Sequence, residues 1–426
     1  MKSKFYSIIA IFSLVTMLFS GIASADNSAQ EATAQFKDVK PNHWAKPSID
    51  RMYQLGIISG FPDGTFRPDD VVTADQFVIM MLRAFSKTYD GKAAEWDREW
   101  LEATQKLYPG RIGSIQNAVW STGFNFTNAK SGYYAKPFID FLYDMSFIQK
   151  YDDVFPLEKD YKTFKKPLSR EKASYILGLW YKSFENNFDT NYTDYAITKA
   201  DVTDLNTFTK GPVEDFKMSV MLAGLMRGYP DHKFKPHRFI TRAEALSLID
   251  RLRNKEARTP FTPDLSGQMY VEAKGNIYLF NSKATFSNYK EIVRIGKTYC
   301  KDGYLDVTGF GVGCFKDEDT YKNWDWTIRI GLLNDVTYLP EATFGIANSV
   351  GNKPGFGYKA DHSFVGTKEF VDAAFEFLAG DGKGLDLKAK VFSMEKTLTS
   401  DYTVITFNGR KIELTRTKEI IYVSLS

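Results

Sequence analysis

Apolar positions recur at a helical period in roughly the first 255 residues. One segment carries Ile49 and Met52 and another carries Phe77 and Met80, each pair three residues apart. This spacing predicts amphipathic helices with one buried stripe each. The first helix is expected to begin just before Pro47, because proline is tolerated only in the first turn.

After about residue 267 the pattern becomes that of strands. β-forming residues alternate or cluster there, and Asn408-Gly409 lies between the runs TVITF and RKIEL. An Asn-Gly pair between two such runs is typical of a two-residue hairpin. The sequence therefore predicts a mainly β C-terminal domain, with one helix near Thr367 to Leu378.

The helical pattern is repeated along the chain. The frame Ala-Lys-Pro-x-Ile-Asp occurs at residues 45–50 and 135–140, and a third copy begins near Val213. Each copy predicts helix, loop and helix, because a segment rich in turn-forming residues follows the first helix. One pair of helices cannot bury its own apolar stripes, so we expect the copies to pack on one another.

The second helix of a repeat has a recognisable start. Thr73 is followed three residues later by Gln76, and Thr241 by Glu244. This is the spacing of a capping box, in which the two side chains satisfy backbone N–H groups at the beginning of a helix. We expect these residues to serve as caps.

The first 25 residues have the features of an export signal. Lys2 and Lys4 precede an apolar run from about Ile8 to Phe19, and Ala25 ends a group of small residues. A retained membrane anchor is the alternative, but the run is short for a spanning helix of about 20 residues. We expect cleavage after Ala25 and no membrane association afterwards.

Composition and charge narrow the function classes. The chain has 426 residues, 43% of them hydrophobic, which is enough for two or more domains. Cleavage of the signal lowers the net charge from +3 to +1, because two lysines lie within it. A nearly neutral chain is not drawn to nucleic acid by its overall charge. The sequence predicts no nucleic-acid partner, no metal, no cofactor and no catalytic residues.

Cys300 and Cys314 are the two cysteines of the chain. Export would place them where thiols oxidise, so we predict that they form a disulfide. The alternative is a pair of buried free thiols.

The N-terminal motifs together resemble those of S-layer homology domains. FKDV, HWA, GIISGFPDGTFRPDD and TADQ stand in order in the first repeat, and TRAE opens the second helix of the third. The resemblance covers roughly Phe36 to Arg253. It implies a pseudo-threefold α-helical bundle of three helix-loop-helix repeats. It also implies that grooves between the repeats bind anionic secondary wall polysaccharide, often bearing pyruvyl ketals.

Two arginines are the main candidate binding residues. Arg170 and Arg242 lie in the first turn of a helix, where a cation opposes the helix dipole at a cost of about 0.3 to 1 kcal/mol. Together with free backbone N–H groups, such an arginine would hold a carboxylate or phosphate. The alternatives are a solvated arginine and a salt bridge to a neighbouring repeat.

The resemblance assigns further polysaccharide contacts to Asp38, Trp44, Gly60 and Gly228. Trp44 would stack on a sugar face, although an aromatic residue beside a helix start is more often part of the core. The two glycines suit the loop backbone and would let a ligand approach closely.

The repeats depart from the family pattern. Ala74 replaces the arginine of repeat one, Asn128 and Lys150 replace the Asp and Gly of repeat two, and Asn206 occupies the Asp position of repeat three by spacing. No single repeat is complete, so we expect one or two working grooves rather than three.

The predicted chain is an α plus β multidomain protein of the cell surface. Its parts are a signal peptide (1–25), repeat one (36–86), an insertion (87–125), repeat two (126–185), repeat three (200–255), a linker (256–266) and the mainly β domain (267–426).

The leading hypothesis is non-covalent anchoring to wall polysaccharide, with the C-terminal domain serving assembly, including self-association in a surface layer, or adhesion. One alternative is a wall-anchored hydrolase with its active site in residues 267–426. The other is a set of repeats that no longer binds glycan and acts as a spacer or docking bundle.

Overall fold

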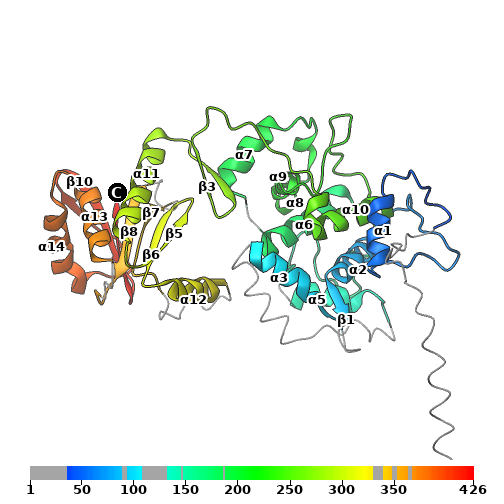
Figure 1. Ribbon diagram of the computed structural model, residues 1–426, viewed down its shortest axis with the longest axis horizontal. Helices are drawn as coiled ribbons and strands as arrows, with labels where there is room; N and C mark the ends of the chain where they lie inside the picture. Colours follow the sequence, from blue (N-terminus) through cyan, green and yellow to red (C-terminus); the bar gives the residue numbers. More distant parts are fainter. Residues whose placement is uncertain are drawn as a thin grey trace, which may run out of the picture.

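The computed structural model describes residues 36–88, 94–107, 132–144, 147–185, 188–329, 339–347, 353–362 and 367–426. The predicted signal peptide, Asn128 and much of the predicted insertion lie outside these residues. A helical part and a sheet part lie side by side along the longest axis, joined by the segment around β3 (Figure 1). The sheet part also contains several helices.

Each repeat folds as helix, loop and helix. The helices are α1 (Lys46–Gln54) and α2 (Ala74–Ala84) in repeat one, α5 (Lys136–Asp144) and α6 (Arg170–Phe184) in repeat two, and α8 (Pro212–Asp215), α9 (Lys217–Leu222) and α10 (Arg242–Arg253) in repeat three. As the sequence predicts, α1 starts with proline in its first turn and α10 with a Thr241–Glu244 capping box.

The repeats pack in a cyclic order. Helix α5 packs on α2, α9 packs on α6, and α1 packs on α10. The first helix of each repeat thus lies on the second helix of the repeat before it, and repeat one closes the cycle against repeat three.

Backbone hydrogen bonds join the repeats at the starts of their second helices, and three of these bonds connect all three repeats. The N–H of Val72 donates to the carbonyl of Ile240 at 3.1 Å, that of Ile240 to Leu168 at 3.0 Å, and that of Leu168 to Val72 at 2.9 Å. The three residues are two positions ahead of α2, α10 and α6. They form a closed ring of hydrogen bonds, with one member from each repeat.

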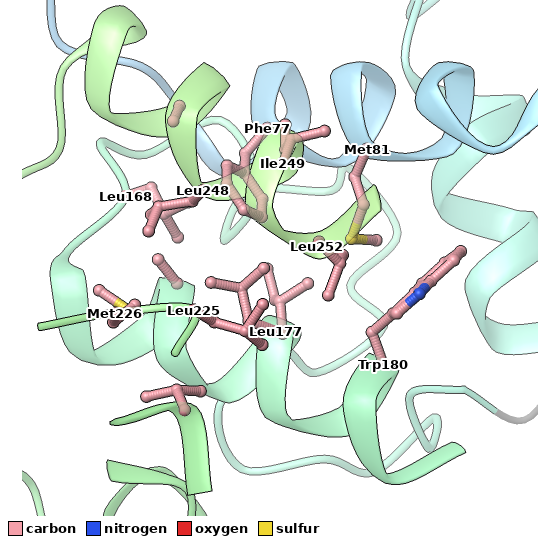
Figure 2. Close-up of a cluster of buried hydrophobic side chains, with 14 of the residues drawn as sticks. Phe77, Met81, Leu168, Leu177, Trp180, Leu225, Met226, Leu248, Ile249 and Leu252 are labelled. Carbon is pink, nitrogen blue, oxygen red and sulfur yellow. The ribbon is translucent and has the colours of Figure 1, made fainter. Parts of the chain in front are cut away.

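The helical core lies between the three second helices. Figure 2 shows side chains from all three meeting there, among them Phe77 of α2, Leu177 of α6 and Ile249 of α10. All three are fully buried. Burial of such a side chain contributes about 1.5 to 3 kcal/mol relative to leaving it exposed, so the repeats stabilise one another through this shared core.

The junctions between successive repeats are packed differently. Between repeats three and one, the buried carboxylate of Asp250 accepts hydrogen bonds from Ser48 at 2.6 Å and from Arg51. At the corresponding positions between repeats two and three, the ring of Phe216 lies against Gly178, where an added Cβ would stand 2.3 Å from a ring carbon. One junction is therefore polar and the other is apolar and tight.

Part of the predicted insertion packs on the helical core. It contains β1 (Ser86–Thr88), β2 (Ala94–Trp96) and α3 (Arg98–Leu107). The buried ring of Trp100 lies 4.5 Å from that of Phe85 and 5.3 Å from that of Phe184, and Asp97 forms an ion pair with Arg253. These contacts make α3 an additional element of the bundle.

The segment expected to be a linker is attached to the helical part. Arg258 forms hydrogen bonds at 2.6 and 2.7 Å with the buried carboxylate of Glu185, and the N–H of Phe261 donates to Met221. At Gly224, with φ of 72°, an added Cβ would lie 2.6 Å from the backbone of Thr259. Close backbone contact here requires glycine.

Helices α7 (Thr190–Lys199) and η2 (Leu205–Thr207) lie between α6 and α8 in the chain. After α10 come η3 (Lys255–Ala257) and the hairpin of β3 (Tyr270–Ala273) and β4 (Asn276–Leu279). The amide of Asn191 in α7 donates to the carbonyl of Leu279 in β4 at 3.1 Å. This contact connects the two parts of the molecule.

The C-terminal part contains an antiparallel sheet of seven strands in the order β5-β6-β7-β8-β11-β10-β9. These are β5 (Tyr304–Thr308), β6 (Gly311–Phe315), β7 (Ala342–Ala347), β8 (Lys353–Lys359), β9 (Thr403–Phe407), β10 (Arg410–Arg416) and β11 (Ile420–Leu425). The hairpin expected at Asn408-Gly409 joins β9 to β10, and both residues have positive φ.

The helical content of this part exceeds the expectation of a single helix. The predicted helix corresponds to α13 (Lys368–Ala379), and the others are α11 (Lys283–Tyr299), α12 (Glu318–Arg329), α14 (Gly384–Met394) and η6 (Glu395–Thr397). Helices α11 and α13 pack on one face of the sheet and share its core. Cys300, at the end of α11, forms a disulfide with Cys314 of β6.

We predict that Gly178→Ala lowers the free energy of unfolding by about 1 to 3 kcal/mol, because its methyl group would overlap the ring of Phe216. Urea unfolding followed by tryptophan fluorescence measures the change. In a Phe216→Leu background the same substitution should destabilise the protein less. An equal loss in both backgrounds would contradict the packing at this junction.

Candidate binding grooves between the helical repeats

Arg170 reaches from the start of α6 into the loop of repeat three. Its Nε donates to the carbonyl of Phe234 and its Nη2 to that of Arg227, both at 2.8 Å. The guanidinium lies over the rings of Tyr229 and Phe234, 4.5 and 4.8 Å from their centroids. The residue is only 6% exposed. Burial lowers the pKa of its guanidinium, although an arginine side chain stays charged in a protein.

Arg242 repeats the Nε hydrogen bond and the two ring contacts of Arg170 one repeat further on. From the start of α10 its Nε donates to the carbonyl of Phe66 at 2.9 Å, and its guanidinium lies 4.9 and 5.0 Å from the ring centroids of Phe61 and Phe66. The second helix of one repeat therefore supplies the cation, and the loop of the next repeat in the cycle supplies the rings around it.

The helix starts themselves are not free to bind an anion. The N–H of Arg170 donates to Arg238 and that of Glu171 to Pro236, while the N–H of Arg242 donates to Asp70. The expectation of free backbone N–H groups beside each arginine is therefore wrong. The same hydrogen bonds that join the repeats use these groups, so any anion must be held by side chains.

Asp38 fixes the backbone of the first loop. Its two carboxylate oxygens accept hydrogen bonds from the N–H groups of Phe66 and Arg67 at 2.8 and 2.7 Å. In repeat three, Asp204 accepts from Phe234 at 2.6 Å and from Lys235 at 2.9 Å. The equivalent of Asp38 is therefore Asp204, and the spacing argument for Asn206 is wrong by two residues.

Gly60 and Gly228 also occupy equivalent places. An added Cβ at Gly60 would lie 2.3 Å from the ring of Phe36, and its φ is 73°. At Gly228 the Cβ would meet Val202 at 3.1 Å, which a small shift relieves. Gly60 is thus required by packing and backbone conformation, whereas Gly228 has more space around it.

Trp44, Arg170 and Gly228 meet at one cavity of about 380 Å³. Trp44 comes from repeat one, Arg170 from repeat two and Gly228 from repeat three. Trp44 is 59% exposed and its ring stacks on that of His43, so it is not part of the core. A second hollow of about 580 Å³, lined by Pro41, Lys46 and Arg51, continues on the other side of Trp44.

The cavity has an excess of positive charge. Arg227 and Arg251 line it with Arg170, against a single acid, Glu244. Glu244 forms an ion pair with Arg238 at 2.7 Å. Within the described residues no carboxylate forms an ion pair with Arg170, Arg227 or Arg251. The arrangement is suited to an anion with an apolar face for Trp44.

The equivalent positions of the other two grooves follow from the cyclic order. The second groove has Tyr134, Arg242 and Gly60, and Tyr134 is exposed like Trp44. Burial and the nearby Asp75 raise the pKa of the Tyr134 hydroxyl to about 12, so it is a neutral donor at pH 7. The third groove would have Pro212, Ala74 and Lys150, and it lacks both the arginine and the aromatic residue.

Sequence reasoning missed two cationic residues of the cavity, Arg227 and Arg251. Arg227 directly precedes the loop glycine and Arg251 follows Glu244 by seven residues, which is two helical turns. That helical spacing was the available signal. Glu244 was expected to be only a cap, yet it also accepts a hydrogen bond from Tyr229 at 2.8 Å.

We predict that Asp204→Ala exposes the amides of Phe234 and Lys235 to solvent exchange, because a buried donor that loses its partner costs about 1 to 3 kcal/mol. Hydrogen exchange followed by mass spectrometry or NMR checks this. Asn206→Ala is the matched control and should leave both amides protected. If only Asn206→Ala removed the exchange protection of these two amides, Asn206 rather than Asp204 would be the equivalent of Asp38.

Among the helices of the described residues, none has both the length and the apolar character that crossing a bilayer requires.

Comparison with known proteins identifies the helical part. The S-layer homology domain model matches residues 35–77 and 223–246. Outer membrane protein SlpA of Deinococcus radiodurans is 36% identical over 86 residues, covering 20% of this chain and 7% of that relative. An endoglucanase of Bacillus sp. strain KSM-635 is 25% identical over 290 residues, 66% of this chain and 26% of the relative. A cellulosome-anchoring protein of Acetivibrio thermocellus is 34% identical over 73 residues, 17% and 16% of the two chains.

The chain thus spans only about a quarter or less of these relatives' length. The matched segments contain Asp38, Trp44 and Gly60 in repeat one and Gly228 and Arg242 in repeat three. The chain carries S-layer homology domain sequence in its helical part.

Proposed function

We propose that the helical repeats anchor this protein non-covalently to the bacterial cell wall by binding an anionic secondary wall polysaccharide. The observation that carries the proposal is the cavity where Trp44, Arg170 and Gly228 meet. The names of the matched relatives, an outer membrane SlpA and a cellulosome-anchoring protein, agree with a role at the cell surface.

The chemistry of the cavity favours an acidic sugar. The flat indole of Trp44 offers an apolar surface to the C–H face of a pyranose ring, and the guanidinium groups of Arg170 and Arg227 offer paired N–H donors to a carboxylate. A pyruvyl ketal places a carboxylate on a sugar ring and so combines both features. We propose pyruvylated polysaccharide as the ligand.

We propose two grooves of unequal strength. The groove with Trp44 and Arg170 has the larger aromatic residue and three arginines, so it should dominate. The groove with Tyr134 and Arg242 retains one cation held in the same way. The third lacks both groups.

A pseudo-threefold arrangement of the repeats underlies this assignment, and we propose it here. The closed ring of hydrogen bonds through Val72, Leu168 and Ile240 supports it. So does the cyclic packing of first helices on second helices. Export by the N-terminal signal, and presentation of the C-terminal part for assembly or adhesion, complete the proposed role.

Co-sedimentation with wall sacculi tests the anchoring. The full chain without residues 1–25 should sediment with intact sacculi and should stay in solution after the secondary polymers are removed by mild acid. Trp44→Ala should weaken binding about tenfold, equivalent to about 1.4 kcal/mol, since the ring is exposed and its loss leaves the fold intact. Arg170→Ala should weaken it at least as much, and Arg242→Ala less.

Arg294→Ala is the control, because Arg294 is an exposed arginine paired with Glu291 in the sheet part. Circular dichroism checks that every variant is folded. Binding that survives removal of the polymers, or that is unaffected by Trp44→Ala and Arg170→Ala alike, would leave the spacer or docking role in place of anchoring.

A further inference from the structure

Helices α11 and α13 cover one face of the C-terminal sheet. The opposite face is not part of the core that they share with the sheet. Residues of this face alternate with buried core residues such as Val312, Phe344 and Phe356 along the strands. Pairing aligns two rows across it, namely Thr308, Gly311, Gly345, Gly355, Ser424 and Glu413, and next to them Asp306, Gly313, Thr343, Gly357, Tyr422 and Thr415.

The middle of this face is hollow because its strands carry glycine. Five glycines on β6, β7 and β8 leave Thr343 as the one larger residue that these two rows place on the three central strands, whereas larger residues occupy the flanking strands. The result is a cavity of about 550 Å³. This volume lies within the range of about 300 to 1,000 Å³ typical of small-ligand sites.

Aromatic rings stand around the hollow. Phe310 and Tyr402 line it and are exposed, and the ring of Tyr422 lies against Gly357, 3.0 Å from an added Cβ. Trp324 of α12 lines it as well, with its ring 5.1 Å from that of Phe315. Aromatic residues exposed together around a cavity provide flat apolar surfaces for a ligand.

The polar part of the remaining lining is mostly hydroxyl groups, and its charges are nearly balanced. Thr308, Thr343 and Thr415 carry hydroxyls on the open face. Asp306 is neutralised by Lys274, whose Nζ lies 2.6 Å from its carboxylate. Glu413 and Arg416 are the other charged residues that line the hollow, and they have opposite signs.

We propose that this hollow binds a neutral oligosaccharide. Sugar rings present apolar C–H faces to aromatic side chains and hydroxyl groups to threonine hydroxyls and to a carboxylate such as Glu413. A balanced lining gives no preference for an anionic chain, in contrast to the arginine-rich cavity of the helical part. The glycines let a ligand approach the backbone of the central strands closely.

The hollow binds the sugar without hydrolysing it. A glycosidase needs two carboxyl groups about 5 to 10 Å apart. Among the described residues that line this hollow the acids are Asp306 on β5 and Glu413 on β10, which are five strand spacings apart, about 24 Å along the sheet. Asp306 is also held by Lys274.

This site is independent of the proposed anchoring, because it lies on a different part of the chain and recognises an uncharged ligand. Titration of the full chain without residues 1–25 with cellotetraose and with the N-acetylglucosamine tetramer tests it. Calorimetry or the change in tryptophan fluorescence measures the dissociation constant. We expect binding of at least one of the two probes.

Tyr402→Ala should weaken that binding about tenfold, and Glu413→Gln should weaken it severalfold. Tyr151→Ala is the matched control, since Tyr151 is an exposed tyrosine of the helical part and should leave affinity unchanged. Trp44→Ala should also leave it unchanged, which separates this site from the wall-binding groove.

Three results would overturn the proposal. They are the absence of binding to both probes, affinity that is insensitive to both Tyr402→Ala and Glu413→Gln, and affinity that falls with Trp44→Ala. Release of shorter sugars during incubation, followed by chromatography, would contradict binding without hydrolysis.

Discussion

Hydrogen bonds between backbone groups join the repeats of the helical part at the starts of their second helices, and three of these bonds form a closed ring. Val72, Leu168 and Ile240 each donate to one partner and accept from the other. These bonds fix where each second helix begins relative to the next loop. The side chain at the first helical position therefore reaches that loop, as Arg170 and Arg242 do. Because the bonds involve only backbone, they persist where repeat one has Ala74 in place of arginine.

The cyclic order also explains which aspects of the site were predictable. The helices of the repeats and their capping boxes follow from local periodicity and spacing, and the sequence predicts them. Counting motif residues repeat by repeat does not show which of them share a groove, because Trp44, Arg170 and Gly228 of one cavity come from three different repeats. Residues from repeats that each look incomplete meet at one cavity. Spacing also failed at Asp204, because Val213 follows Asp204 by nine residues whereas the equivalent Ala45 follows Asp38 by seven.

In the C-terminal part, local signals predicted the hairpin at Asn408-Gly409 and the helix α13. Helix α11 was missed although its buried residues Tyr289, Ile292 and Ile295 recur every three positions. Its threonine, isoleucine, valine and aromatic residues also favour strands, and packing on the sheet decides between the two. The hollow could not be predicted from the sequence. Single glycines only weaken a strand prediction, and which of them lie next to one another depends on how the strands pair.

The segment that leaves the helical part has a mechanical consequence. Arg258 is held by two hydrogen bonds to the buried Glu185, and Phe261 is bonded to Met221. A force that pulls on the sheet part is therefore transmitted to the bundle through Glu185 of repeat two and Met221 of repeat three, the residues to which this segment is bonded. In the proposed anchoring, tension on the sheet part would load the same repeats that supply Arg170 and Gly228, so the sheet part and the wall-binding cavity would bear force along one continuous path.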